Sequence, residues 1–142
     1  MYSARSIANQ YRQTSVASAV LDADPHRLIA LMLSGARERA RMAAACLSRN
    51  DGRRGDFARK AQAISEASAI VGSLNGALDI NAGGEIATGL RALYDYIQRR
   101  LLEANIGNDA APLREVDDLL GDIENAWMAI APGTATAPVA AR

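Results

Sequence analysis

Four segments of this chain repeat mainly apolar residues at steps of three and four, a spacing that fits amphipathic helices. Turn-forming stretches separate the segments: Asn50-Asp51-Gly52, Asn81 to Gly84, and Gly107-Asn108. Asp24 and Pro25 open the first segment in the order typical of a helix N-cap and the first helical residue. Four helices of similar length with short connections predict an all-α fold, an antiparallel four-helix bundle.

Each predicted helix carries one apolar seam that we expect to face the bundle axis. The first seam is Ile29, Leu33, Ala36, Ala40, Ala43 and Leu47, and the second is Phe57, Ala61, Ile64, Ser68, Val71, Asn75 and Leu78. The third is Ile86, Leu90, Leu93, Ile97, Leu101 and Ala104, and the fourth is Leu113, Val116, Leu120, Ile123, Trp127 and Ile130. We expect Asp56 to cap the second helix and the third helix to begin near Glu85.

The bundle is expected to occupy residues 23–131, between two segments of different composition. Residues 1–22 carry scattered apolar side chains and are predicted to form an N-terminal lid segment or short helix. Residues 132–142 consist mainly of small residues with a proline, and we expect this tail to be disordered.

Charge and composition exclude several classes of partner. Lys and Arg total 16 and Asp and Glu total 16, whereas a nucleic-acid-binding protein usually carries a basic excess, so no nucleic-acid partner is expected. No apolar run approaches the ~18 residues of a membrane span, so no membrane insertion is expected. The single Cys46 cannot form an internal disulfide, and no signal peptide is recognisable. These features predict a cytoplasmic (cytosolic) protein.

The chain offers little for catalysis, so we predict that it is not an enzyme and has no cofactor or metal. His26 is the only histidine, and a metal site normally needs several histidine, cysteine or carboxylate ligands. A four-helix bundle with one histidine leaves a histidine phosphotransfer domain as an alternative. That chemistry needs an imidazole exposed in the middle of a helix, whereas His26 lies in a first turn. We therefore expect a solvated or locally hydrogen-bonded His26.

The first helix has more large apolar residues than one buried face requires. Those between Leu28 and Leu33 spread over roughly 200° of its circumference, whereas a core-facing stripe needs only about 100°. The excess has two explanations: a wide face buried against two neighbouring helices, or a groove that accepts an apolar helix, with Met32 and Met42 as adaptable surface. The N-terminal segment, in which Ile7 and Tyr11 lie one helical turn apart, could cover such a groove.

Several stretches, in this order and at this spacing, resemble the bacterial flagellin export chaperones, the FliS family. The resemblance runs from about residue 9 to residue 130 and is weakest between Arg53 and Asn81. The stretches that carry it are QYRQTSV, DPHRLIALMLSGA, GGEIATGLRALYDYIQRRLLEANIGND and EVDDLLGDIENAWMAI.

The resemblance implies a cytoplasmic chaperone without an ATPase cycle. Such a chaperone binds the C-terminal segment of new flagellin, prevents its early polymerisation and helps deliver it to the flagellar type III export apparatus. It also implies that the N-terminal segment with its tyrosine, here Tyr11, packs over part of the client surface and can be displaced. Together with the apolar excess, this predicts a client-peptide-binding set of Ile7, Tyr11, Leu28, Leu31, Met32, Met42 and Tyr96.

An adaptor or structural bundle remains the main alternative to the chaperone. In that case the surplus apolar surface would serve a permanent homodimer, and the protein would ignore flagellin.

Overall fold

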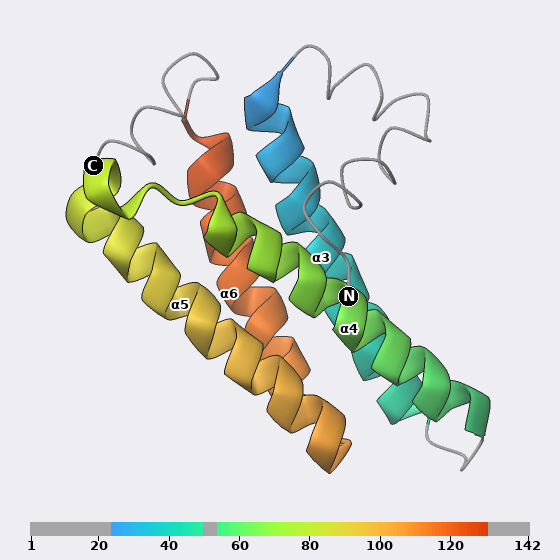
Figure 1. Ribbon diagram of the computed structural model, residues 1–142. Helices are drawn as coiled ribbons and strands as arrows, with labels where there is room; N and C mark the ends of the chain where they lie inside the picture. The colour runs from blue at the N-terminus through green and yellow to red at the C-terminus, as the bar shows by residue number, and fades with distance from the viewer. Residues whose placement is uncertain (1–23, 50–53, 131–142) are drawn as a thin grey trace.

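A computed structural model describes residues 24–49 and 54–130 of the chain, and this part contains helices and turns but no strand. Its helices are α3 (Pro25–Ser48), α4 (Arg54–Gly76), α5 (Ile80–Gly107) and α6 (Ala111–Met128). Figure 1 shows α3 and α5 running in one direction and α4 and α6 returning in the other. The predicted all-α four-helix bundle is confirmed. The predicted lid and tail, residues 1–22 and 132–142, lie outside the described residues.

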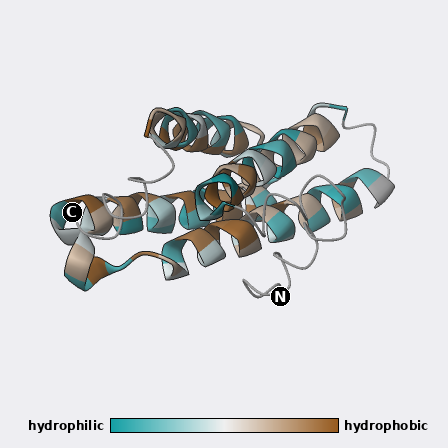
Figure 2. Cartoon of the chain, turned by 90° about the horizontal axis from the view of Figure 1, so that it is seen from above, coloured by the Kyte–Doolittle hydropathy of each residue, from teal (hydrophilic) through white to brown (hydrophobic). Residues whose placement is uncertain are grey.

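The helices occupy the four corners of the bundle. α3 packs against α4 and α6, and α5 packs against the same two helices, so α3 and α5 are diagonal to each other. Figure 2, coloured by hydropathy, shows hydrophobic and hydrophilic stretches alternating along the helices, as an amphipathic pattern requires.

The core combines a column of small residues on α3 with large side chains from the other helices. Ala36, Ala40 and Ala43 are fully buried, and their small size lets α4 and α6 approach α3 closely. Each large buried side chain contributes roughly 1.5–3 kcal/mol relative to remaining in water. The largest fully buried side chains are Leu33, Val71, Ile97, Leu101, Leu113, Val116 and Leu120.

The first turn of α3 packs against the last turn of α6 and is hydrogen-bonded to it. Asp24 caps α3 as predicted, because its carboxylate accepts the backbone N–H of His26 at 3.0 Å. The rings of His26 and Trp127 stack with their centroids 4.8 Å apart, and the indole N–H donates to the His26 carbonyl oxygen at 2.8 Å. His26 Nε2 lies 3.0 Å from the Trp127 carbonyl oxygen. The expectation of a solvated or locally hydrogen-bonded His26 is wrong for its side chain, since only 4% of the residue is exposed and the ring lies within hydrogen-bond distance of Trp127 on α6.

The two predicted helix starts around Asp56 and Gly84 need correction. Asp56 lies inside the first turn of α4, which already begins at Arg54, so it is not the cap. α5 begins at Ile80 after Asp79, whose carboxylate accepts the backbone N–H of Ala82 at 3.0 Å. The chain then changes direction at Gly84, where φ 57° and ψ −137° suit only glycine. The stretch from Asn81 to Gly84, predicted as a turn, therefore forms a short piece of helix that ends in a kink at Gly84. The rest of α5 continues from Glu85.

The seam predicted for α4 is rotated to one side of the true buried face. Ser68 and Asn75 from that seam are partly exposed. Ile86, predicted to lie in the seam of α5, is 49% exposed. Ile64 and Val71 of the predicted α4 seam are buried, and the other buried residues of the described part of α4 are Lys60, Ala63, Ala67, Ala69, Ile70 and Leu74.

Lys60 is buried because it closes the C-terminal end of α5. Its Nζ donates to the carbonyl oxygen of Asn105 at 3.0 Å and to Oδ1 of Asn108 at 2.7 Å. Asn108 is the C-cap residue of α5 in a left-handed conformation with φ 51°, which asparagine tolerates better than most residues. Burial lowers the pKa of Lys60. The ammonium group thus satisfies helix-end oxygens that would otherwise lack donors.

Two adjacent leucines of α5 test this division between core and surface. Leu101 is 1% exposed and Leu102 is 58% exposed. Leu101→Ala should lower the free energy of unfolding by about 2–5 kcal/mol, because it leaves a cavity in the core. Leu102→Ala should change it by less than about 0.5 kcal/mol. Urea unfolding followed by circular dichroism measures both, and equal losses would contradict the assigned orientation of α5.

Candidate functional site

Three apolar residues of α3, Leu28, Leu31 and Met42, lie on the side of the helix away from its column of buried alanines. Leu31 and Met42 lie within about 20° of each other around the helix, and Leu28 lies about 60° from Leu31. Leu28 and Leu31 are partly buried, whereas Met42 is 50% exposed. Met32 differs from these residues because it is 6% exposed and belongs to the core. Leu28 and Leu31 near the start of α3, together with Met42 about three turns further on, are called the α3 stripe below, and the exposed Glu38 lies on the same side between them.

An apolar cavity of about 260 Å³ lies at the end of the bundle where α3 begins and α6 ends. No charged residue lines it, and burial raises the pKa of Tyr94 to about 12, so that this side chain stays neutral. Apolar cavities of about 150 Å³ already hold a ring the size of benzene. The space suits one large apolar side chain. Its walls are Pro25, Leu28, Ile29, Leu33, Leu74, Ala77, Leu78, Leu90, Tyr94, Ile123 and Trp127.

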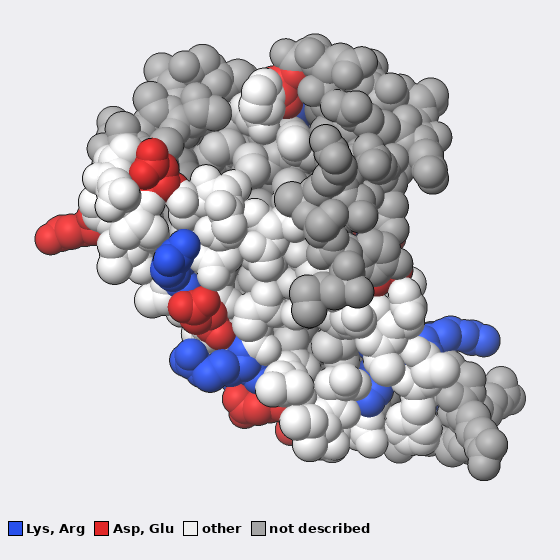
Figure 3. All heavy atoms as spheres, viewed as in Figure 1, with Lys and Arg blue, Asp and Glu red and all other residues white. Residues whose placement is uncertain are grey.

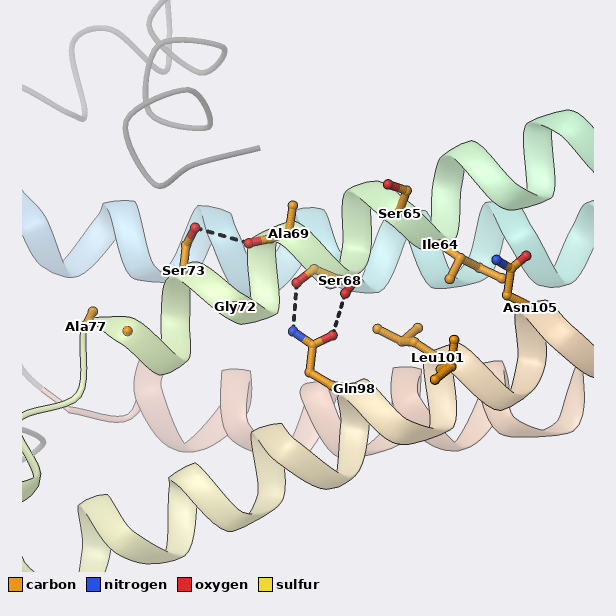
Figure 4. A pocket seen from close by; sticks show the side chains of 12 residues that line it. Ile64, Ser65, Ser68, Ala69, Gly72, Ser73, Ala77, Gln98, Leu101 and Asn105 are labelled. Atoms are coloured by element: carbon orange, nitrogen blue, oxygen red, sulfur yellow. Dashed lines mark hydrogen bonds between the residues drawn. The ribbon is translucent and has the colours of Figure 1, made fainter. Parts of the chain in front are cut away.

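A longer groove of about 890 Å³ runs between α4 and α5 (Figure 4). Its α4 wall consists mainly of small residues, and its α5 wall includes Leu101 and the exposed Leu102. Gln98 reaches across the groove, where its amide nitrogen donates to the Ser68 carbonyl oxygen at 2.8 Å. The Ser68 hydroxyl donates to Gln98 Oε1 at 2.6 Å. The lining residues are Ile64, Ser65, Ser68, Ala69, Gly72, Ser73, Gly76, Ala77, Gln98, Leu101, Leu102 and Asn105.

The groove and the cavity are neighbours, because Ala77 lines both, and no charged residue lines either of them. In Figure 3, charged side chains gather along the α5 edge of this face. Between α5 and α4 the surface of the described residues is mostly white, which marks uncharged residues. Beyond Leu102, α5 also exposes Ile106, which is 76% accessible one turn further on. The groove was not predicted from the sequence, although Ser68, Gly72 and Gly76 follow one another there at four-residue spacing.

The sequence matches the family described as Flagellar protein FliS over residues 7–134. It is 44% identical to the flagellar secretion chaperone FliS of Salmonella typhimurium over 133 residues, which is 93% of this chain and 94% of the relative. The chain belongs to the FliS family. The flagellar secretion chaperone FliSB of Pseudomonas aeruginosa is 39% identical over 127 residues, covering 89% of this chain and 96% of the relative. FliS of Bacillus subtilis is 35% identical over 117 residues, covering 82% of this chain and 80% of the relative.

Membership of the FliS family makes this chain a chaperone of flagellar secretion and not an enzyme. The phosphotransfer alternative is therefore wrong, and the burial of His26 against Trp127 gives the physical reason, since a phosphodonor could not approach the ring. Within residues 24–49 and 54–130, no group of three or more His, Cys, Asp or Glu side chains is arranged to hold a metal ion. None of the helices in this part is long and apolar enough to cross a membrane.

The structure does not bring all the predicted client-binding residues together. Tyr96 lies on α5, the helix diagonal to α3, and its hydroxyl donates to the carboxylate of Glu115 on α6 at 2.8 Å. The guanidinium of Arg99 lies 5.6 Å from the centre of the Tyr96 ring. Tyr96 therefore faces α6 and a charged neighbourhood, away from the α3 stripe. Ile7 and Tyr11 lie outside the described residues.

An ion-pair network links the other side of α3 to α6. Arg37 bonds to Asp117 through Nε and to Glu124 through Nη1, both at 2.7 Å, and Arg41 bonds to Asp117 at 3.0 Å. Gly121 gives the Arg37 guanidinium its space, because a Cβ there would lie 2.9 Å from it. Burial raises the pKa of Asp117, but hydrogen bonds from both arginines outweigh it and hold this pKa below its ordinary value of 3.8.

This network should make the fold sensitive to acid. Because the folded pKa of Asp117 is lower than the unfolded one, the ion pairs stabilise the fold above pH 3.8 and their contribution is lost as the pH falls through the folded pKa. Asp117→Asn should lower the free energy of unfolding at neutral pH by up to about 1 kcal/mol and weaken its acid dependence. Urea unfolding across the acid range measures this. Asp118→Asn, at the exposed neighbouring position, is the control, and an equal effect there would contradict the network's role.

Proposed function

We propose that this FliS-family protein is a cytoplasmic export chaperone for flagellin. It binds the C-terminal segment of flagellin, prevents premature polymerisation and aids delivery to the flagellar type III export apparatus. The observation that carries this proposal is the 44% identity, over 93% of the chain, to a flagellar secretion chaperone. The exposed Met42 on α3 and the exposed Leu102 in the groove between α4 and α5 support it.

The physical task of such a chaperone is to occupy the face that flagellin uses to assemble. A segment that packs as an amphipathic helix in a filament has its apolar face free before assembly. A groove that buries the same face competes with self-association by mass action and needs no nucleotide. The stripe of Leu28, Leu31 and Met42 runs lengthwise along α3 and suits such a helix.

The energetics of this surface fit reversible holding. Burial of apolar area yields about 25 cal/mol per Å². Most of that gross gain is offset by the loss of freedom of the two partners and by ordering of the client segment. The net affinity therefore depends on how much of the apolar gain remains after these costs.

The N-terminal segment is proposed as a lid over part of this surface. Residues 1–22 carry Ile7 and Tyr11, and the segment joins α3 at Asp24, one turn before Leu28. Its apolar side chains would cover the α3 stripe until a client displaces them. A covered stripe would also protect the free chaperone from self-association.

Calorimetric titration of a flagellin C-terminal peptide tests the function. The unaltered protein should bind, and Met42→Asp should weaken binding about tenfold, because a carboxylate on the stripe would be desolvated by the client. Met42 is 50% exposed, so the substitution should leave the fold intact. Met42→Leu keeps the apolar surface and should bind like the unaltered protein. Absence of binding by the unaltered protein would end the proposal, and equal binding by Met42→Asp would remove the stripe from the site.

Removal of residues 1–17 tests the lid. The truncated protein should bind more of a dye that fluoresces on apolar surfaces, because the α3 stripe loses its cover. The full-length chain at the same concentration is the reference. An unchanged dye signal, with an unchanged circular dichroism spectrum, would contradict the lid.

A further inference from the structure

We propose that the outer face of α5 pairs in an antiparallel direction with the same face of a second copy of this chain. The pairing is weak and reversible, and two ion pairs at its centre fix the register. The outer face of α5 is a set of six exposed residues on the side of the helix away from the bundle. They are Thr88, Ala92, Asp95, Arg99, Leu102 and Ile106.

The spacing of these residues is that of a helix that packs lengthwise against another helix. From Thr88 to Ile106 the steps are four, three, four, three and four, as at the a and d positions of a coiled coil. At about 100° per residue, the six side chains cover roughly 80° of the circumference of α5. The fully buried Ile97 and Leu101 lie on the opposite side of the helix. The outer face is therefore a packing stripe that no described helix of the bundle covers.

The outer face complements itself when two copies lie antiparallel. Its centre falls midway between Asp95 and Arg99, so a two-fold rotation there sets Asp95 opposite the partner's Arg99. The same rotation sets Leu102 opposite the partner's Ala92 and Ile106 opposite the partner's Thr88, so each large side chain meets a smaller one. In a parallel pair, Asp95 would face the partner's Asp95 and Arg99 the partner's Arg99, and like charges repel. The antiparallel direction is thus selected by charge and by size.

The two central charges are available for a second copy. Asp95 accepts a hydrogen bond from Asn75 Nδ2 through Oδ1 at 3.0 Å, and its other carboxylate oxygen has no partner among the described residues. Arg99 lies 5.6 Å from the centre of the Tyr96 ring and forms no ion pair within residues 24–49 and 54–130. The neighbouring Arg100, by contrast, is bound to a carboxylate of α6 at 2.6 Å. Figure 3 shows positive and negative side chains alternating along this edge of α5.

The size of the outer face makes the dimer weak. Thr88 to Ile106 span about 27 Å of helix, and a strip about 10 Å wide gives roughly 300 Å² on each copy. A stable interface usually buries about 800 Å² on each partner. The apolar gain comes mainly from Leu102 and Ile106, which are 58% and 76% exposed in the single chain. The dimer therefore forms at high protein concentration and exchanges with the monomer.

Exchanging the two central charges provides the test. In sedimentation equilibrium from about 10 μM to about 1 mM, the full-length protein should associate as its concentration rises. Arg99→Glu sets two carboxylates opposite each other, and Asp95→Arg sets two guanidinium groups opposite each other. Each variant alone should associate about tenfold more weakly or not at all. An equal mixture of the two variants restores both ion pairs between unlike copies and should associate within about threefold of the unaltered protein.

Arg114→Glu is the matched control, because Arg114 is an exposed residue of α6 and the change of charge is the same. It should leave the association unchanged. Circular dichroism of each variant shows that the fold is kept, and recovery in the mixture cannot come from misfolded chains. A full-length protein that stays monomeric at about 1 mM would overturn the proposal and leave this face to a different partner. Association of both single variants at the unaltered strength, or no recovery in their mixture, would also overturn it.

Discussion

The column of alanines on α3 is the constraint on which the rest of this bundle depends. With Ala36, Ala40 and Ala43 fully buried, α3 comes close to α4 and α6 and leaves little volume for large side chains of its own. The large core residues come mostly from the other helices. On the other side of α3, Leu28 and Leu31 are partly buried and Met42 is 50% exposed, so part of the apolar excess of this helix becomes surface.

The fold could be predicted where the two faces of a helix differ strongly in size and polarity. α3 and α6 met this condition, and Asp24 and Pro25 fixed the start of α3. α4 did not, because alanine and serine occur on all its sides, so the predicted seam was rotated away from the buried face. Lys60 was missed for a different reason: its burial depends on oxygen acceptors at the far end of α5, which local spacing cannot reveal.

The candidate site could be predicted only in part, since a helical pattern gives the direction of a side chain around its own helix but not which neighbour covers it. Met32 belongs to the core and Tyr96 faces α6 for that reason, although both resemble their exposed neighbours in sequence. The α4–α5 groove was not predicted, because glycine, serine and alanine do not stand out in a pattern of large apolar residues. Such residues shape a surface through the side chains they lack, and this becomes visible only when two helices are placed side by side.

A chaperone that hands its client to an export apparatus must be stable without the client and must not hold it through many specific bonds. Among the described residues, Asn75 Oδ1 is the single buried side-chain polar atom without a hydrogen-bond partner. Ser68 and Gln98, His26 and Trp127, and Lys60 with the end of α5 are paired within the bundle. A client therefore contributes apolar contact and few hydrogen bonds. If the proposed function holds, most of the gain from apolar contact is offset by ordering the client, so binding on such a surface is reversible.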